Sequence, residues 1–248
     1  MNRRQVLWAL GGLGAAASGY AWHERRGLTR ADLGAEGKPR DASAPFLPYG
    51  IGAILEYASL APSGHNAQPW TVRAGDGELR IGTDRSRWLP KVDPSNREVA
   101  LSIGAFLENL LIAAPSYGYR ADYTATGSDA AGAELLQVKL KKIPLSHASL
   151  ESLRGRRTVR SGQMPKALSG DDVGRLTAYF DNEAHFFSPA SREGRYLAEG
   201  TIEANQLQAL RDDAQQELAE WIRWTNSGAR AHRDGLTPES MEISGVAG

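Results

Sequence analysis

The sequence predicts an α+β fold in which helices pack with a mixed or antiparallel sheet around a buried central helix. Residues 95–114 carry apolar side chains too densely for a surface helix, so we expect this helix at the centre of the fold. Short segments on either side of it combine β-forming residues with turn signals or alternate apolar and polar side chains. They predict strands at residues 70–73, 79–82, 119–126 and 135–141.

The composition is that of a globular protein and excludes several classes of function. The chain has 248 residues, enough for one large domain or two small ones. Its 29 Lys and Arg residues balance 29 Asp and Glu residues, which argues against nucleic acid or an anionic membrane as a bulk electrostatic partner. Cysteine is absent, which excludes disulfides and thiolate catalysis, and the five histidines show no paired metal-ligand spacing. No metal site is therefore predicted.

The first 22 residues differ from the rest of the chain. Arg3 and Arg4 precede an uncharged run that extends from Val6 to Trp22. This pattern is similar to a twin-arginine export signal, and the alternative is an apolar N-terminal helix. We expect an exported protein, periplasmic or anchored in the membrane by this segment, or a cytoplasmic one if the segment is not a functional leader. Residues 23–47 are charged and rich in Gly, Ala and Pro, and they predict a linker.

Residues 48–145 are expected to form a first half. A short helix ends at Pro62, and the strands at 70–73 and 79–82 form a hairpin. Ser95 and Glu98 have the spacing of a capping box, which predicts the start of the central helix. Its least exposed side chains are expected to be Phe106, Leu107, Leu110 and Leu111.

Residues 146–248 are expected to form a second half. We predict a helical turn at 149–155, a helix at 169–180, a strand at 184–188 and a long helical region at 192–224. The last 24 residues show no periodicity. A helix, a turn and a strand recur in the same order at 50–73 and 170–188, which taken alone is weak evidence for two pseudo-repeated halves.

The most informative stretch is ASLAPSGHNAQPW at residues 58–70. Ser63, Asn66 and Gln68 provide hydrogen-bond donors and acceptors, and Gly64 permits close approach of a ligand to the backbone. Such a loop suits the edge of a flat heterocycle, on which carbonyl and N–H groups alternate. The alternative is a self-capped helix end, in which these side chains satisfy nearby backbone groups.

A second cluster, RGRRTVRS, lies at residues 154–161. Arginine binds phosphate through two parallel hydrogen bonds, and Thr and Ser add short donors. The alternatives are a solvated basic loop and a contact with nucleic acid. Aromatic residues do not interleave with the arginines, and the net charge is zero, so a single phosphate group is the favoured ligand.

These two motifs together resemble those of the nitroreductase flavoprotein family. The stretch APSGHNAQPW is similar to its A-P-S-x-x-N-x-Q-P-W motif, and RRTVR at 156–160 is similar to its flavin-phosphate motif. The segment DRSRWLPKVDPSNRE at 84–98 and the helix after it resemble the Acg-type branch, in which one longer chain imitates the usual dimer. The resemblance implies a nitroreductase-like fold. It also implies a pseudo-dimer within one chain, with one flavin site built from one copy of each motif and an incomplete second half.

The resemblance also implies a cofactor, FMN. Arg156, Thr158 and Arg160 would bind its phosphate. An oxidoreductase of this kind takes electrons from NAD(P)H and passes them to a small acceptor such as a nitroaromatic compound or a quinone. The alternative is a degenerate member that binds or sequesters flavin without turnover.

At the other end of the flavin, the resemblance implies that Ser63, Gly64 and Asn66 line the cofactor and that Gln68 shapes the loop. His65 is expected to pack against the loop. No side chain is predicted to be catalytic, because the hydride chemistry belongs to the flavin.

Overall fold

The computed structural model describes residues 50–75, 77–127, 134–146, 150–162, 166–180 and 183–243. These residues divide into two compact units. The first comprises the described residues up to Thr158 together with those from Leu218 onward, and the second is Val159–Glu217. The predicted export segment at 1–22 and the predicted linker at 23–47 lie outside the described residues. The boundaries of these two units do not coincide with the boundary between the halves predicted at 48–145 and 146–248. Those halves therefore stay a prediction.

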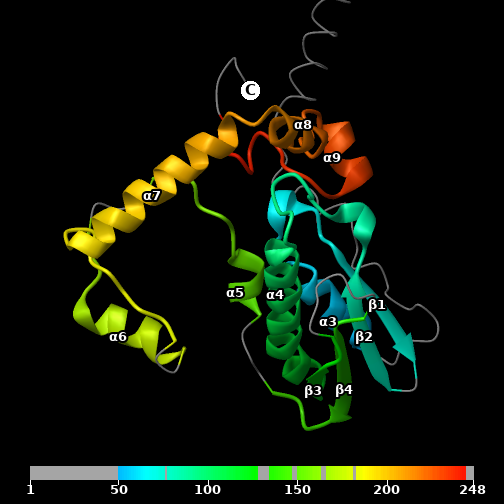
Figure 1. Ribbon diagram of the computed structural model, residues 1–248. Helices are drawn as coiled ribbons and strands as arrows, with labels where there is room; N and C mark the ends of the chain where they lie inside the picture. Colours follow the sequence, from blue (N-terminus) through cyan, green and yellow to red (C-terminus); the bar gives the residue numbers. More distant parts are fainter. Residues whose placement is uncertain are drawn as a thin grey trace, which may run out of the picture. The chain divides into compact units, whose positions relative to one another are not determined.

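The first unit is built on a four-stranded antiparallel sheet (Figure 1). The strands lie in the order β1-β2-β4-β3, so the hairpin formed by the first two strands pairs with the last strand of the chain order. All four strands expected from the sequence are confirmed, and their pairing is antiparallel rather than mixed. Their bounds are Trp70–Gly75 for β1, Glu78–Thr83 for β2, Tyr119–Ala125 for β3 and Leu136–Lys142 for β4.

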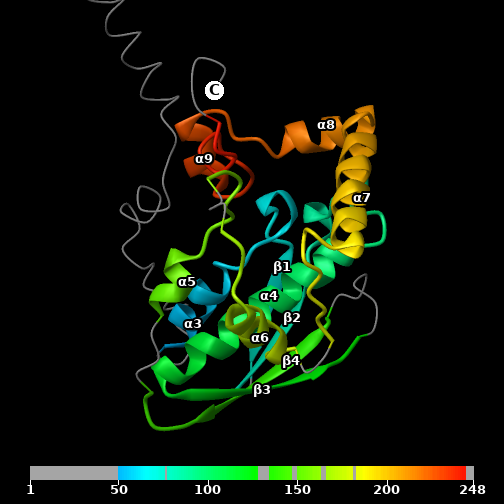
Figure 2. The same ribbon diagram turned by 90° about the vertical axis from the view of Figure 1, so that its left-hand side faces the viewer.

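Two helices, α3 (Ile51–Ala58) and α4 (Arg97–Ala113), pack side by side and form the core with the sheet (Figures 1 and 2). Phe106 and Leu110 of α4 are fully buried, and the ring of Phe106 lies 5.1 Å from that of Trp70. The expectation of a central helix is confirmed for most of its circumference. Leu101 is an exception, because 71% of it is exposed, and Leu111 is only half-buried.

Helix α4 is also long and apolar enough to cross a membrane, together with the short 3-10 helix η3 (Ala114–Tyr117) that follows it. Its packing gives a different explanation of that composition. The buried amide of Asn109 donates to the carbonyl of Tyr57 on α3 at 3.3 Å, so polar as well as apolar groups join the two helices. Except for Leu101, the large apolar residues of α4 are buried or half-buried.

The start of α4 differs from the sequence prediction. The carboxylate of Asp93 accepts hydrogen bonds from the backbone N–H groups of Arg97, Glu98 and Val99, at 2.8–3.1 Å. These are the first N–H groups of the helix, which have no partner within it. The capping box predicted at Ser95 is therefore wrong. Asp93 lies 95% buried in the preceding turn and reaches all three donors, and no spacing rule for a capping box includes it.

The remaining helices of the first unit are short. Helix α5 (Glu151–Gly155) confirms the predicted helical turn, and its Leu153 belongs to the core.

The long helical region predicted at 192–224 consists of two helices, α7 (Arg192–Ala209) and α8 (Asp212–Glu220). Helix α8 extends across the boundary between the units. Helix α9 (Asn226–His232) lies in the segment for which the sequence predicted no element.

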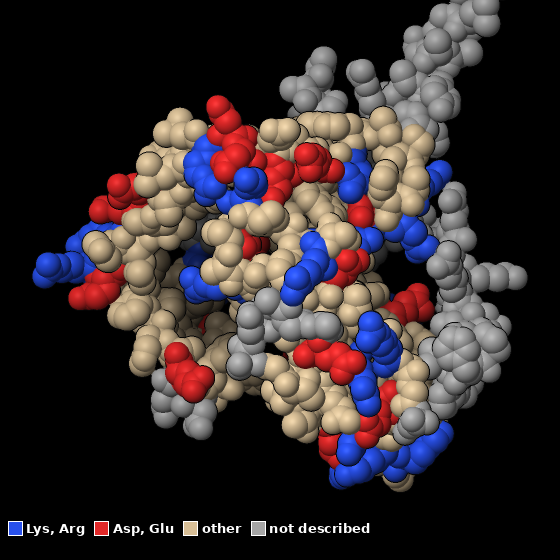
Figure 3. Space-filling view, turned by 45° about the vertical axis from the view of Figure 1, so that its right-hand side comes forward, with Lys and Arg blue, Asp and Glu red and all other residues tan. Residues whose placement is uncertain are grey.

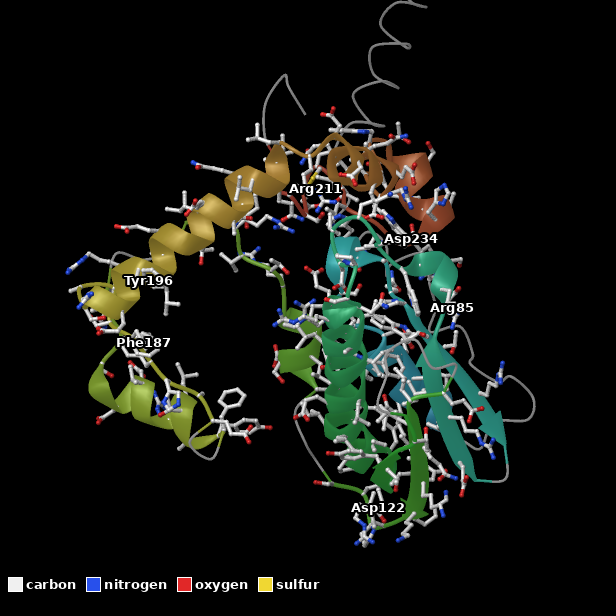
Figure 4. All side chains as sticks on the ribbon, viewed as in Figure 1. Arg85, Asp122, Phe187, Tyr196, Arg211 and Asp234 are labelled. Carbon is white, nitrogen blue, oxygen red and sulfur yellow. The ribbon has the colours of Figure 1, made fainter. Side chains whose placement is uncertain are left out.

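The second unit contains α6 (Gly170–Ala178) and α7. Ser169 caps α6 in a capping box with Asp172. Neither helix has a buried residue, and large side chains such as Tyr196, labelled in Figure 4, are exposed. The strand predicted at 184–188 is wrong, because the described residues 183–188 form neither helix nor strand. The second copy of the expected helix–turn–strand repeat, at 170–188, therefore lacks its strand.

Acidic and basic side chains of the sheet form ion pairs with one another. Lys139 pairs with Glu78 at 3.4 Å, and Lys141 pairs with Asp122 at 2.7 Å. Figure 3 shows acidic and basic side chains interspersed on the face that it draws. Exposed pairs of this kind contribute little to stability, about 0–1 kcal/mol each.

Candidate functional site

The loop Ser63–Gln68 connects α3 to β1 in a compact but unusual conformation. Gly64–Asn66 form a 3-10 turn, η1, and His65, Asn66 and Gln68 all adopt positive φ angles of 49–54°. Residues other than glycine rarely adopt this region, and each such residue costs of order 1–3 kcal/mol unless its surroundings compensate. The loop therefore depends on contacts that hold it.

Some of these contacts are local. The backbone N–H of Gln68 donates to the hydroxyl of Ser63 at 2.9 Å, and the N–H of Asn66 donates to the carbonyl of Ser63 at 3.0 Å. Ser63 thus satisfies the turn from its own side chain and backbone, as the self-capped alternative predicts.

The other contacts come from the C-terminal part of the first unit. The side-chain amide of Asn66 donates to the carbonyl of Gly235 at 2.9 Å, and the N–H of Gly235 donates back to the carbonyl of Asn66 at 3.1 Å. The side-chain amide of Gln68 donates to the carbonyl of Arg233 at 2.8 Å. Sequence reasoning missed these partners, which lie more than 160 residues away in a segment without periodicity. The loop is therefore joined to the segment that follows α9.

An ion-pair network fixes the same segment. Asp234, labelled in Figure 4, accepts from Arg223 at 2.8 Å and from Arg87 at 3.0 Å. Arg87 is the last residue of the 3-10 helix η2 (Arg85–Arg87). It also donates to the carbonyl of Ala67, within the loop, at 2.9 Å. The side chains of Asp234 and Arg223 are only 10% and 13% exposed, so solvent screens this pair weakly.

The opposite side of the loop faces the start of α4. A side chain at Gly64 would crowd the ends of the Glu98 and Leu89 side chains, which would have to move to make room. These residues line a small pocket that has a volume of about 190 Å³, including space open to solvent. Partial burial, and secondarily the neighbouring carboxylate of Asp93, raise the pKa of Glu98 above its usual value. The enclosed space in this pocket is only about 10 Å³, far below the roughly 300–1,000 Å³ typical of ligand sites.

The arginine motif begins at the end of α5. The guanidinium of Arg156 is half-buried and donates to the carbonyl of Leu60 at 3.3 Å, and burial lowers its pKa. Leu60 lies three residues before Ser63, so the first arginine of one motif is close to the loop that carries the other. Thr158 is exposed in the same unit. Arg160 is exposed and belongs to the second unit.

Comparison with known proteins points in the same direction as these motifs. Two matched relatives are named provisionally as NAD(P)H nitroreductases. One is PigM from Serratia sp. (strain ATCC 39006), 30% identical over 137 residues, which are 51% of this chain and 38% of PigM. The other is acg from Mycobacterium tuberculosis, 36% identical over 72 residues, which are 29% of this chain and 22% of acg. The matches thus span well under half of either relative.

Other comparisons are weaker. A nitroreductase-like protein from Streptococcus mutans matches over 57% of this chain and 89% of its own, at 18% identity and a TM-score of 0.34, which is too low to define a shared fold. No family model matches the sequence. The chain is therefore similar, over part of its length, to curated proteins that are named as NAD(P)H nitroreductases.

Proposed function

We propose that the protein is an FMN-dependent oxidoreductase that passes electrons from NAD(P)H to a nitroaromatic compound, a quinone or a similar small acceptor. The names of the curated relatives support this reaction class. Bound FMN would supply the chemistry, by accepting hydride from the nicotinamide and delivering electrons to the acceptor. The protein would bind and orient both partners.

The residues present fit the two chemically different ends of FMN. Arg156, Thr158 and Arg160 offer the charged and hydroxyl donors that a phosphate group requires. Asn66 and Gln68 each carry a carboxamide oxygen besides the amide group that the C-terminal segment engages, and such an oxygen can accept from a ring N–H. Ser63 and Gly64 would complete the contact with the ring.

The observation that carries this proposal is the hydrogen bond from Arg156 to Leu60. The two positions are separated by 96 residues in the sequence, yet this bond holds Arg156, the first arginine of its motif, beside Leu60, three residues before the start of the loop that would line the ring. A solvated basic loop would instead leave the guanidinium of Arg156 in water. The start of the arginine motif and the loop thus lie close together within the first unit, whereas Arg160 belongs to the second unit.

A second function, flavin binding without turnover, is favoured by a different observation. The pocket beside Gly64 is small, and the amide donors of Asn66 and Gln68 already have backbone partners. A protein of this kind would retain or sequester flavin but would offer NAD(P)H and an acceptor little access to it.

The absorbance spectrum of the purified full chain distinguishes these functions. Two flavin bands after incubation with FMN and removal of excess ligand are expected in both cases. Bleaching of the bands by NADH or NADPH, and their return on addition of a quinone, are expected only of the oxidoreductase. A spectrum without flavin bands at FMN concentrations up to the millimolar range would contradict both functions.

A further inference from the structure

The segment that contacts the candidate loop has a folded structure of its own. Ile222 and Leu236 form an isolated parallel bridge, with hydrogen bonds from Arg223 to Leu236 at 2.7 Å and from Leu236 to Trp221 at 2.8 Å. These bonds close a loop around α9. The residues from Trp221 to Leu236 are named the C-terminal clamp below.

Gly235 shows how closely the clamp is built. Its φ angle is +77°, and a side chain at this position would collide with the carbonyl of Trp221 and touch Arg223. Glycine is therefore required both by its backbone conformation and by the space around it. The same residue exchanges two hydrogen bonds with Asn66, so the most constrained point of the clamp is its contact with the loop.

Asp234 connects the clamp to the base of the loop. Its carboxylate binds Arg223 within the clamp and Arg87 outside it, and Arg87 in turn donates to the carbonyl of Ala67. Truncation of one member of such a shielded network leaves an uncompensated charge, which is more damaging than removal of an exposed pair. Asp234 thus links the clamp, through Arg87, to the loop.

From these contacts we infer that the C-terminal clamp holds Ser63–Gln68 in the conformation that receives the ring of a flat ligand, and that Asp234 is its positioning residue. The inference rests on the proposed function, since it assigns the ring end of FMN to this loop. Three residues with positive φ would relax to other conformations once the clamp is released. Asn66 and Gln68 would then lose the orientation that their bonds to Gly235 and Arg233 impose.

The inference predicts a specific pattern of ligand binding. When only a fraction of molecules has the competent loop, the apparent dissociation constant rises by the inverse of that fraction, whichever ligand is used. Loss of the clamp should therefore weaken FMN and riboflavin by the same factor. A defect at the phosphate end would instead weaken FMN alone.

The test compares Asp234→Asn with Asp122→Asn in the full chain. Asp122 also forms ion pairs in the first unit, with Arg120 and Lys141, but it lies on the sheet and both of these partners are sheet residues. For Asp234→Asn we expect about a tenfold loss of affinity for both FMN and riboflavin, corresponding to a competent fraction of roughly one tenth. Asp122→Asn should change neither affinity. Flavin fluorescence quenching measures both ligands under the same conditions.

Hydrogen exchange gives a second readout that needs no flavin. In Asp234→Asn, the amides of peptides covering 59–70 and 221–237 should exchange faster, while those of α4 keep their protection. Should Asp234→Asn fail to fold, Gly235→Ala opens the same contact without a change of charge and should give the same pattern. Thermal unfolding followed by circular dichroism checks that each variant is folded.

The outcomes separate the two proposals. A wild-type chain that binds neither flavin overturns the proposed function, and unchanged exchange at 59–70 in the folded variants overturns the clamp. If the wild type binds flavin but Asp234→Asn and Gly235→Ala bind it equally well, the positioning role is wrong. A loss for FMN that spares riboflavin would also overturn it, because the effect would then lie at the phosphate.

Discussion

Arg156 and Arg160 are the residues whose proposed role is easiest to isolate, because they concern one chemical group of the ligand. Charge-assisted hydrogen bonds contribute about 1.5–3 kcal/mol each, or roughly a 10- to 100-fold change in affinity. Arg156→Ala and Arg160→Ala should therefore weaken FMN by this amount and riboflavin very little. Titration of both ligands measures the difference.

Arg154→Ala is the matched control for this prediction. Its guanidinium lies over the ring of Tyr57, with 5.1 Å between them, and it precedes the motif. It should leave the ratio of the two affinities unchanged. Equal losses for FMN and riboflavin in the Arg156 and Arg160 variants would show that these arginines act on the fold and do not bind phosphate.

Glu98 provides a prediction on pH. Burial and Asp93 raise the pKa of Glu98 in the folded chain above its usual value of about 4.5, so the folded state disfavours its charged form. The free energy of unfolding therefore falls as pH rises from below 4.5 through the raised pKa of Glu98. Glu98→Gln should remove this decrease in stability. Because the side chain is partly exposed, we expect a gain of less than about 1 kcal/mol at pH 7 and none at pH 3. Denaturant unfolding at both pH values measures it, with Glu108→Gln, exposed on the same helix, as the control. A gain of equal size at pH 3 would contradict the electrostatic origin.

At the scale of elements, the start of α4 depends on one carboxylate outside the helix. Asp93→Ala removes the acceptor of three backbone N–H groups and should lower the free energy of unfolding by about 1–3 kcal/mol. Ser95→Ala alters the residue that the sequence pattern suggests as the cap. It should change the free energy of unfolding by less than about 0.5 kcal/mol. The reverse order of effects in urea unfolding would restore the capping box.

The burial of α4 gives a second comparison within one element. Leu110 is fully buried and Leu101 is 71% exposed, although both belong to the same helix. Leu110→Ala should cost about 2–5 kcal/mol, as cavity-forming leucine substitutions do, and Leu101→Ala less than about 0.5 kcal/mol. Similar costs for the two variants would mean that α4 is covered on both faces in solution.

For the whole molecule, the central prediction is that FMN stabilises the folded chain through Asn66 and Arg156, both of which belong to the first unit. A ligand that binds only the folded state raises the midpoint of thermal unfolding by mass action. Added FMN should therefore raise this midpoint in the full chain, and Asn66→Ala and Arg156→Ala should each reduce the rise. Circular dichroism measures the midpoints with and without FMN. A rise that both variants leave unchanged would contradict a flavin site at these residues.

The secondary structure of the first unit could be predicted well from local patterns. Alternation and turn residues were sufficient for all four strands, and apolar density was sufficient for α4, because each signal is contained in a few neighbouring residues. The prediction failed at the strand expected at 184–188, because this short stretch has no alternation of apolar and polar residues to distinguish a strand from a loop. It also missed α9, whose cap at Thr225 is a local signal but whose body has few apolar residues.

The candidate site divides in the same way. The sequence by itself determined which residues are candidates for the ligand chemistry, since the loop at 63–68 and the arginines at 156–160 resemble the motifs of a flavoprotein family. Only the tertiary structure decided what surrounds them. Asn66 binds backbone groups of Gly235, and Gln68 binds the carbonyl of Arg233. Asp93, rather than Ser95, caps the start of α4. Those partners are set by how distant segments meet when the core closes, and no local period or spacing in the chain records that geometry.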